Sequence, residues 1–311
     1  QTMFMKRAVN YGLVKAVDMK QAILLLSFGT PCEKSDLVPY MTSIRHGKAP
    51  SEGELEVLTA RYDAIGQWDN VNLQTMGEQQ KKSLETLLGV EDIYLAYLHK
   101  PHSMEQAIKA IVDTGYTSIL SIVTSPFYSV VGTGAYERKL QAILQEYSHI
   151  SLDNIQSWWD RSQFIEYWSS RLANLNPTQA DTICIFSAHS VPVTTVGDYV
   201  FHITSAAEKI AERVDLNHWC TAWQSAPPYG EWLGPTIETV IEQALLEGAK
   251  RIICVPFGFV SDHVEILYDN DILCRRIVEA TGAVYERVPM PNGNALFMAG
   301  MAEAIKERIN K

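Results

Sequence analysis

Apolar and polar positions follow two periods along most of the chain. Short aliphatic runs such as Ala22–Leu26 and Ile252–Val255 end at glycine or proline, which is typical of buried strands. Between such runs, apolar positions recur every three or four residues over ten or more residues, which predicts helices. One of these helices begins with a capping box formed by Ser51 and Glu54. Strands that alternate with helices of this length indicate parallel βαβ units and an α/β fold.

Two parts of the chain repeat the same strand-end signals in the same order. The repeated signals are LSFGTP (26–31) and FSAHSVP (186–192), followed by SIVTSPFYS (121–129) and IICVPFGFVSDH (252–263). We therefore expect two similar Rossmann-like, doubly wound domains, each with a parallel four-stranded sheet. A ligand cleft is expected between them at the carboxyl ends of the strands.

We expect the domains to occupy residues 19–155 and 156–311. The final helix, predicted over 295–310, can pack back on the first domain. The first 18 residues are expected to lie outside the fold, because their apolar patch is interrupted and lacks a convincing signal sequence.

Composition narrows the function classes. Of the 311 residues, 47% are hydrophobic and 20% charged, and the net charge of −10 argues against a nucleic-acid partner. No apolar run approaches the ~18 residues of a membrane-spanning helix. Five scattered cysteines without a C-x-x-C pair indicate free thiols in a reducing compartment, so we expect a cytoplasmic protein. We also expect a monomer. The sequence lacks both a dinucleotide fingerprint and a P-loop, which argues against a nucleotide cofactor.

An acidic segment follows the predicted strand Ile252–Val255. Asp262, Glu265 and Asp269 are three and four residues apart, in a pattern with helical spacing that begins near Ser261. In a helix these carboxylates share one face, where they repel unless a cation, a proton or a basic partner offsets the cost. The alternative is a solvated acidic face on which Asp262 caps the helix.

His189 lies at the end of another predicted strand, Thr182–Phe186, where α/β folds place their ligands. If this strand and Ile252–Val255 belong to one sheet, the imidazole can face the carboxylates. Such a pair supports proton transfer near neutral pH or capture of a divalent first-row metal. The alternative is that the ring only shapes its turn.

These motifs resemble the ferrochelatase family, in particular its coproporphyrin III-type members from Gram-positive bacteria. SAHSVP (187–192) and VPFGFVSDHVEILYDND (255–271) carry the resemblance most specifically. It extends through LLLSFGTP (24–31), YMTSIRHGKAP (40–50), RYDAIG (61–66), PFYSVVGTGAY (126–136), QSWWDRSQFIEYW (156–168) and WLGP (232–235).

The resemblance implies a porphyrin cleft and insertion of Fe²⁺, the substrate metal, into a free-base porphyrin, with haem as product and release of two protons. It favours coproporphyrin III over protoporphyrin IX. His189 is implied as proton acceptor or metal-delivery ligand and Glu265 as its partner. Asp269 is implied as the next carboxylate towards solvent, so these three residues form the implied metal set.

The resemblance also implies residues that contact the porphyrin. These are Phe28, Ile44, Tyr128, Trp232 and Val260 as apolar walls, with Arg45 facing propionates. The scattered cysteines predict no iron–sulfur cluster. Transient partners that deliver iron or accept haem are expected, as for any chain that handles these reactive species.

Three departures keep other interpretations open. Phe28 stands where many coproporphyrin-type members have a tyrosine that reaches iron, and Leu273 ends the acidic face early. The loop Gly66–Leu73 replaces one that touches propionates in the family. The alternatives are therefore a haem or porphyrin carrier with little catalysis, or a chelatase for another tetrapyrrole and metal.

Overall fold

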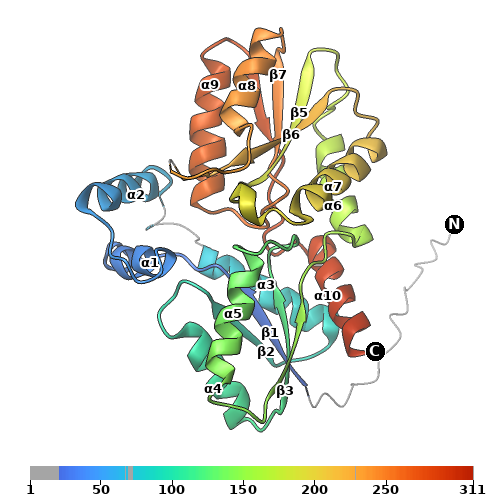
Figure 1. The fold of residues 1–311 in the computed structure, drawn as a ribbon. Helices are drawn as coiled ribbons and strands as arrows, with labels where there is room; N and C mark the ends of the chain where they lie inside the picture. Colours follow the sequence, from blue (N-terminus) through green and yellow to red (C-terminus); the bar gives the residue numbers. More distant parts are fainter. Residues whose placement is uncertain (1–20, 67, 69–72, 228, 311) are drawn as a thin grey trace, which may run out of the picture.

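The computed structural model describes residues 21–66, 68, 73–227 and 229–310. The first 18 residues, which we expected to lie outside the fold, are not among the described residues. Positions 67 and 69–72 of the loop Gly66–Leu73 are not among them either. Two parallel four-stranded sheets form the framework, which confirms the predicted α/β class (Figure 1).

The two sheets have the same topology. The first sheet has the order β2-β1-β3-β4, and its strands are β1 Gln21–Ser27, β2 Ile93–Tyr97, β3 Ser118–Val123 and β4 Ser151–Ile155. The second has the order β6-β5-β7-β8, with β5 Thr182–His189, β6 Trp219–Gln224, β7 Arg251–Val255 and β8 Val284–Arg287. In each sheet the first strand in sequence pairs with the next two, so the repeated sequence signals correspond to a repeated strand order.

Helices cover both faces of each sheet. In the first half they are α1 Leu37–Ile44, α2 Glu52–Ala64, α3 Leu73–Leu88, α4 Ser103–Asp113 and α5 Thr133–Leu144, with a short 3₁₀ turn, η1, at Lys34–Asp36. In the second half they are α6 Ser162–Ala173, α7 Tyr199–Arg213, α8 Ile237–Leu246, α9 Arg275–Glu279 and α10 Ala295–Ile309, with the 3₁₀ turn η2 at Val193–Thr195 and the segment η3 at Glu265–Cys274.

The strands are apolar on both faces because each face is buried. In β1, Leu24 contributes to the core under α4 and α5, whereas Leu25 faces the opposite core. That opposite core is continuous with the one beneath α6 and α7 of the second sheet. One apolar interior therefore joins the two halves and fixes how their strand ends face each other.

The repeated Pro-Phe signals meet in this shared core. The ring centroids of Phe127 and Phe257, which follow β3 and β7, are 5.5 Å apart in an edge-to-face arrangement. Both rings are almost fully buried. Such aromatic pairs add about 0.5–1.5 kcal/mol beyond the area that they bury.

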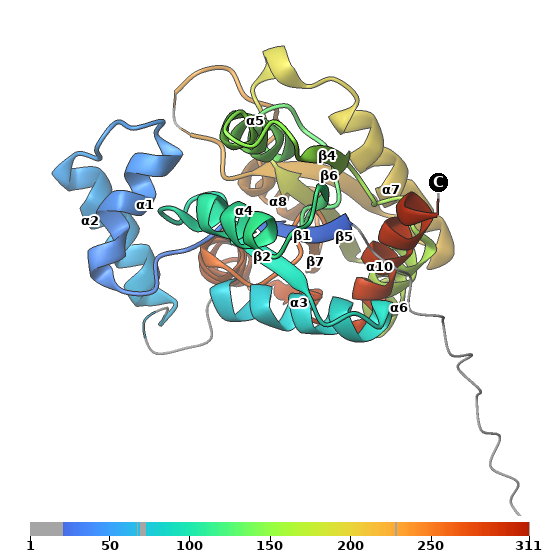
Figure 2. The same cartoon turned by 90° about the horizontal axis from the view of Figure 1, so that it is seen from below.

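The last helix connects the two halves. α10 packs against α3 and α6, and Arg308 forms two 2.6 Å contacts with Asp153 of β4. In both views α1 and α2 project to one side of the two sheets and the other helices (Figures 1 and 2). No helix in the described part of the chain combines the length and apolarity needed to cross a membrane.

Candidate active site

His189 is the last residue of β5. Two hydrogen bonds hold it, one at its backbone carbonyl and one at its imidazole ring. The Tyr199 hydroxyl donates to the His189 carbonyl at 3.1 Å, and the imidazole Nδ1 lies 2.6 Å from the carbonyl oxygen of Ser190. Because a carbonyl only accepts, Nδ1 carries a proton in this contact. Nε2 is thereby directed at the carboxylate of Glu265, 3.6 Å away.

A close crossing of two chain segments brings Glu265 to this position. β5 and β7 are paired in one sheet, as the sequence interpretation required. After β7, the Gly258 N–H donates to the carbonyl of Ser187 at 3.1 Å. A Cβ at Gly258 would lie 2.4 Å from the Cβ of Ala188, so only glycine permits this approach without a shift.

A second imidazole lies on the other side of the carboxylate. His263 Nε2 is 3.7 Å from the second oxygen of Glu265. Both His189 and Glu265 remain accessible, with 39% and 30% of their side-chain surfaces exposed. A substrate can therefore reach the pair directly, whereas the His263 side chain is more enclosed, at 17% exposed.

The acidic segment is helical, but it is not the α-helix that the spacing predicted. η3 is a π-helix over Glu265–Cys274, in which backbone bonds join residue i to i+5. The prediction that Asp262 caps the helix is wrong, because Val264 is the residue at that end. The Asp262 carboxylate is instead bound by Arg287 at 3.1 Å and by Asn292 at 2.9 Å.

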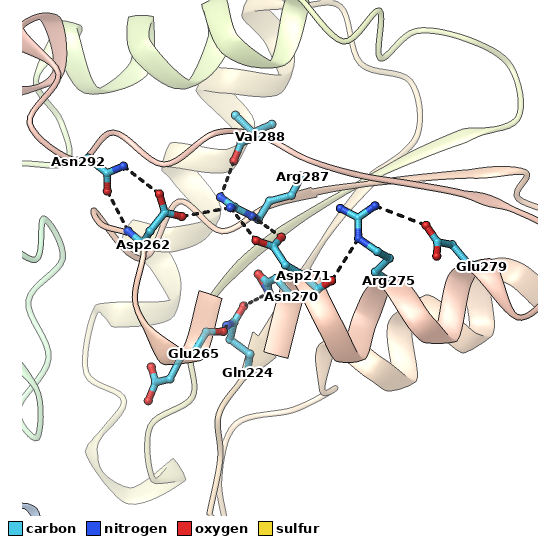
Figure 3. Close-up of polar contacts among 10 residues, drawn as sticks. All are labelled: Gln224, Asp262, Glu265, Asn270, Asp271, Arg275, Glu279, Arg287, Val288 and Asn292. Carbon is cyan, nitrogen blue, oxygen red and sulfur yellow. Dashed lines mark hydrogen bonds and ion pairs between the residues drawn. The ribbon is translucent and has the colours of Figure 1, made fainter. Parts of the chain in front are cut away.

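Arg287 holds the segment on both sides of Glu265. Besides Asp262, its guanidinium binds the two oxygens of Asp271 at 2.7 and 2.9 Å (Figure 3). The side chain is only 13% exposed, and bidentate pairs of this kind fix geometry as well as charge. Asp262 and Asp271, on either side of Glu265, therefore share one arginine as their partner.

The electrostatics of the pair favour an ionised state. Burial alone would lower the pKa of His189, but the Glu265 carboxylate outweighs it and raises that pKa to about 9. Burial likewise acts to raise the pKa of Glu265, but His189 outweighs it and lowers that pKa to about 2. At neutral pH the pair is an imidazolium and a carboxylate.

Asp269 has a different environment. Burial, and then repulsion from Glu265, raise its pKa to about 6, against the opposing influence of Arg61 and a bond from Ser225. Arg61 Nη1 lies 3.4 Å from one oxygen, and the Ser225 hydroxyl donates to the other at 3.0 Å. Arg61 also stacks over the ring of Tyr268, 5.1 Å from its centroid. Asp269 is thus a carboxyl that changes protonation close to neutral pH.

Comparison with known proteins agrees with this geometry. The family model described as Ferrochelatase matches residues 20–309. A coproporphyrin III ferrochelatase of Geobacillus kaustophilus is 33% identical over 302 residues, covering 92% of this chain and 95% of that protein. The chain belongs to the ferrochelatase family.

A second relative supports the assignment, and two solved structures share the fold. A coproporphyrin III ferrochelatase of Staphylococcus aureus (strain Mu50) is 33% identical, over 92% of this ferrochelatase and 98% of that protein. The solved structure titled SirB from Bacillus subtilis with Fe³⁺ has a TM-score of 0.58 at 12% identity, covering 93% and 95% of the two chains. CbiX, described as the terminal enzyme of sirohaem synthesis in denitrifying bacteria, has a TM-score of 0.52, also at 12% identity, covering 92% and 98%. At these identities the structures show a shared fold only.

The ferrochelatase does not bring all the implied metal residues together. Within the residues that the structure describes, no three His, Cys, Asp or Glu side chains lie close enough to hold a metal ion. His189 and Glu265 form a pair, whereas Asp269 is bound to Arg61 and Ser225.

The implied wall residues differ in exposure. Phe28 and Ile44 are 39% and 37% exposed, which leaves apolar surface for a ligand, whereas Val260 is buried. Tyr128 and Trp232 are half-buried. The Phe28 ring lies 4.5 Å from His99, whose Nδ1 is 2.9 Å from the Ser43 hydroxyl. Sequence reasoning missed His99 and Arg61 as neighbours of the site, although His99 follows a strand end like His189.

Arg45 is paired within its own half. Its guanidinium forms a short ion pair with Glu54, whose other oxygen accepts from the backbone and hydroxyl of Ser51 at 2.7 and 2.8 Å. The predicted capping box is thereby confirmed. A separate polar groove of about 520 Å³ lies between β4 and α10, but its arginines already pair with Asp153 and Glu307.

Proposed function

We propose that this ferrochelatase inserts Fe²⁺ into coproporphyrin III, bound in a cleft between the two halves, and releases two protons. The accessible His189–Glu265 pair, 3.6 Å apart at the strand ends of the second sheet, carries the proposal. Imidazole and carboxylate are suitable both for proton transfer and for a first-row divalent metal. The choice of coproporphyrin rests on two relatives, each 33% identical, that are coproporphyrin III ferrochelatases.

The ionised pair sets the order of proton movements. Nε2 of His189 is protonated at neutral pH, so this nitrogen must lose its proton before it can accept one from a pyrrole N–H. An arriving Fe²⁺ promotes this loss, because a dication beside the imidazolium is repelled until the proton leaves. Glu265 keeps its charge throughout and thereby compensates the metal.

Asp269 is proposed as the next proton carrier. Its pKa of about 6 allows it to take up and release a proton near neutral pH, as an intermediate carrier requires. Arg61 beside it is 38% exposed, which places the route close to solvent. Two such transfers remove both pyrrole protons for each iron inserted.

Apolar and aromatic residues, of which Phe28 and Ile44 are the most exposed, are proposed to support the macrocycle. Phe28, Ile44, Tyr128, Trp232 and Val260 form the proposed walls, and Arg45 the propionate contact. Phe28 has no hydroxyl, so its ring supports the porphyrin face and does not coordinate iron. The apolar contacts, remote from the reacting nitrogens, can supply the energy that bends the ring for metal entry.

The place of action is proposed from cysteine chemistry. Cys184, Cys220, Cys254 and Cys274 are free thiols, and burial raises the pKa of Cys184 and Cys254 to about 12. Unpaired thiols are typical of the reducing cytoplasm. We propose a cytoplasmic monomer that exchanges iron and haem with transient partners. Light scattering of the purified chain at micromolar concentration tests the monomer.

An anaerobic assay tests the function. Fe²⁺ is added to equal concentrations of coproporphyrin III or protoporphyrin IX, and the absorbance of the metallated product is followed over many turnovers. The expected result is catalytic turnover, faster with coproporphyrin III, and its loss in His189→Ala with porphyrin binding retained. Stoichiometric binding without turnover would instead identify a carrier, and turnover only with Co²⁺ or Ni²⁺ another chelatase.

A further inference from the structure

Gln224 is hydrogen-bonded to both chain segments that carry the His189–Glu265 pair. It is the last residue of β6, is only 1% exposed, and stands opposite His189 in the strand register. Its carbonyl accepts the N–H of Ser190 at 2.9 Å, which extends the pairing one residue past the strand end. The backbone of Gln224 therefore holds the His189–Ser190 turn, which carries the imidazole.

The side chain of Gln224 faces the other member. Its Nε2 donates to the carbonyl of Glu265 at 3.3 Å, and its Oε1 accepts from Asn270 at 3.2 Å (Figure 3). The same Oε1 also accepts from the Ser187 hydroxyl at 2.9 Å. Ser187 and Asn270 are fully buried. Buried hydrogen bonds of this kind lack competition from water, so each constrains the position of its partners.

The two π-helical contacts of this amide belong to one turn. Glu265 and Asn270 are residues i and i+5, which are the residues joined by a π-helical backbone bond. π-helices are rare because their intrinsic geometry is unfavourable, so contacts from outside have to hold them. Gln224 contacts both ends of this turn, which is the first turn of the π-helix and begins at Glu265.

We propose that Gln224 is the positioning residue that sets the separation of His189 and Glu265. Its backbone holds the imidazole turn and its side-chain amide holds the first π-helical turn, so one residue fixes both partners. The inference rests on the proposed function of the pair. The competing explanation is a buried amide that stabilises the fold without affecting chemistry.

A substitution series separates the contacts. Gln224→Glu keeps both acceptor contacts of Oε1 but removes the donor to Glu265, and Gln224→Met removes all three side-chain bonds with little change in shape. Ser187→Ala removes one donor to Gln224 and leaves the Glu265 and Asn270 contacts. Ser121→Ala breaks a buried side-chain bond to Asn154 in the first sheet and controls for general destabilisation.

The readouts are kcat and KM for iron insertion, porphyrin affinity by fluorescence quenching, and the thermal midpoint. We expect Gln224→Glu and Gln224→Met to lower kcat by about 10- to 100-fold, the usual effect of a small misplacement, with KM and porphyrin affinity changed less than about 3-fold. Ser187→Ala should lose less than about 3-fold, and Ser121→Ala should keep the wild-type kcat.

Three results would overturn the proposal: an unchanged kcat in Gln224→Glu, a raised KM with unchanged kcat, or an equal loss of kcat in Ser121→Ala. If Gln224→Met does not fold, Gln224→Glu and Ser187→Ala still decide between the explanations. Wild-type protein that inserts no metal would contradict the proposed function itself, which is a different outcome from an active wild type with an active Gln224→Glu variant.

Discussion

Arg61 of α2 and Asp269 of the π-helix are in contact at 3.4 Å, although 208 residues separate them in the chain. The pair joins the projecting α1–α2 region to the second sheet's site. Arg61 is 38% exposed while Asp269 is 8% exposed, so the contact lies where the buried acid approaches the surface. Burial and repulsion from Glu265 outweigh the influence of Arg61, so the pKa of Asp269 is raised to about 6.

Asp269→Asn should change the pH dependence of stability. Burial raises the folded pKa of Asp269 to about 6, above its ordinary value of 3.8, so the native state binds an extra proton between these values. The wild type therefore loses stability as pH rises through 6, and the variant, which cannot ionise, does not. Relative to wild type, the variant should gain about 1 kcal/mol between pH 5 and 7.5 in urea unfolding. Asp113→Asn is the exposed control, and a constant difference across this range would contradict the assignment.

His99 should limit stability in acid. Burial, and then the nearby Lys139 and His46 charges, lower its pKa from 6.5 to about 4, so it is neutral in the fold. The unfolded chain takes up a proton below pH 6.5 that the native state refuses until about pH 4, and stability is lost as pH falls. This contribution should reach about 2 kcal/mol between pH 7 and 4.5, and His99→Gln should remove it. His149→Gln, at an exposed position, is the control, and an equal acid dependence in both variants would refute the role of His99.

Glu54→Gln should release Arg45 for a propionate. The Glu54 carboxylate is stabilised by the Ser51 backbone and hydroxyl and by Arg45, which lower its pKa to about 2. Without the negative charge, the guanidinium has no competing anion, and KM for coproporphyrin III should fall about two- to fivefold with kcat unchanged. Steady-state kinetics measure this, with Glu56→Gln on the same helix as control. A rise in KM would mean that the ion pair instead shapes the binding surface.

Gly258→Ala should disturb the crossing that places Glu265. The added Cβ would meet the Cβ and Cα of Ala188 at 2.4 and 2.6 Å, one residue before His189. Overpacking of this kind costs about 1–3 kcal/mol, and displacement of the loop should lower kcat as well. Gly53→Ala, which meets nothing within 4 Å, is the matched control in unfolding and turnover assays. Unaltered stability of Gly258→Ala would show that the two segments separate readily.

Much of the fold followed from periodicity, because strands and helices leave local patterns. The apolar run at Ile252–Val255 and the glycine after it indicated both a buried strand and the sheet edge where Glu265 lies. The position of His189 at a strand end was predictable for the same reason.

The remaining features depend on partners that are remote in sequence. Asp262 was interpreted as a cap because spacing alone cannot reveal Arg287, which approaches from β8. The same acidic spacing fits α- and π-helices, and contacts such as that of Gln224 decide between them. The sequence pattern around Arg61 could not indicate its contact with Asp269, since α2 and the π-helix belong to different halves of the chain.

The repeated strand order also bears on how such proteins diversify. Phe28 and Tyr128 follow strands of the first half, while both reactive side chains come from the corresponding strand ends of the second. Of the proposed macrocycle contacts, Phe28 and Tyr128 lie in the first copy, so substitutions at these two positions leave the residues of the His189–Glu265 pair unchanged. The duplicated strand order thus separates variation in these two contacts from the pair itself.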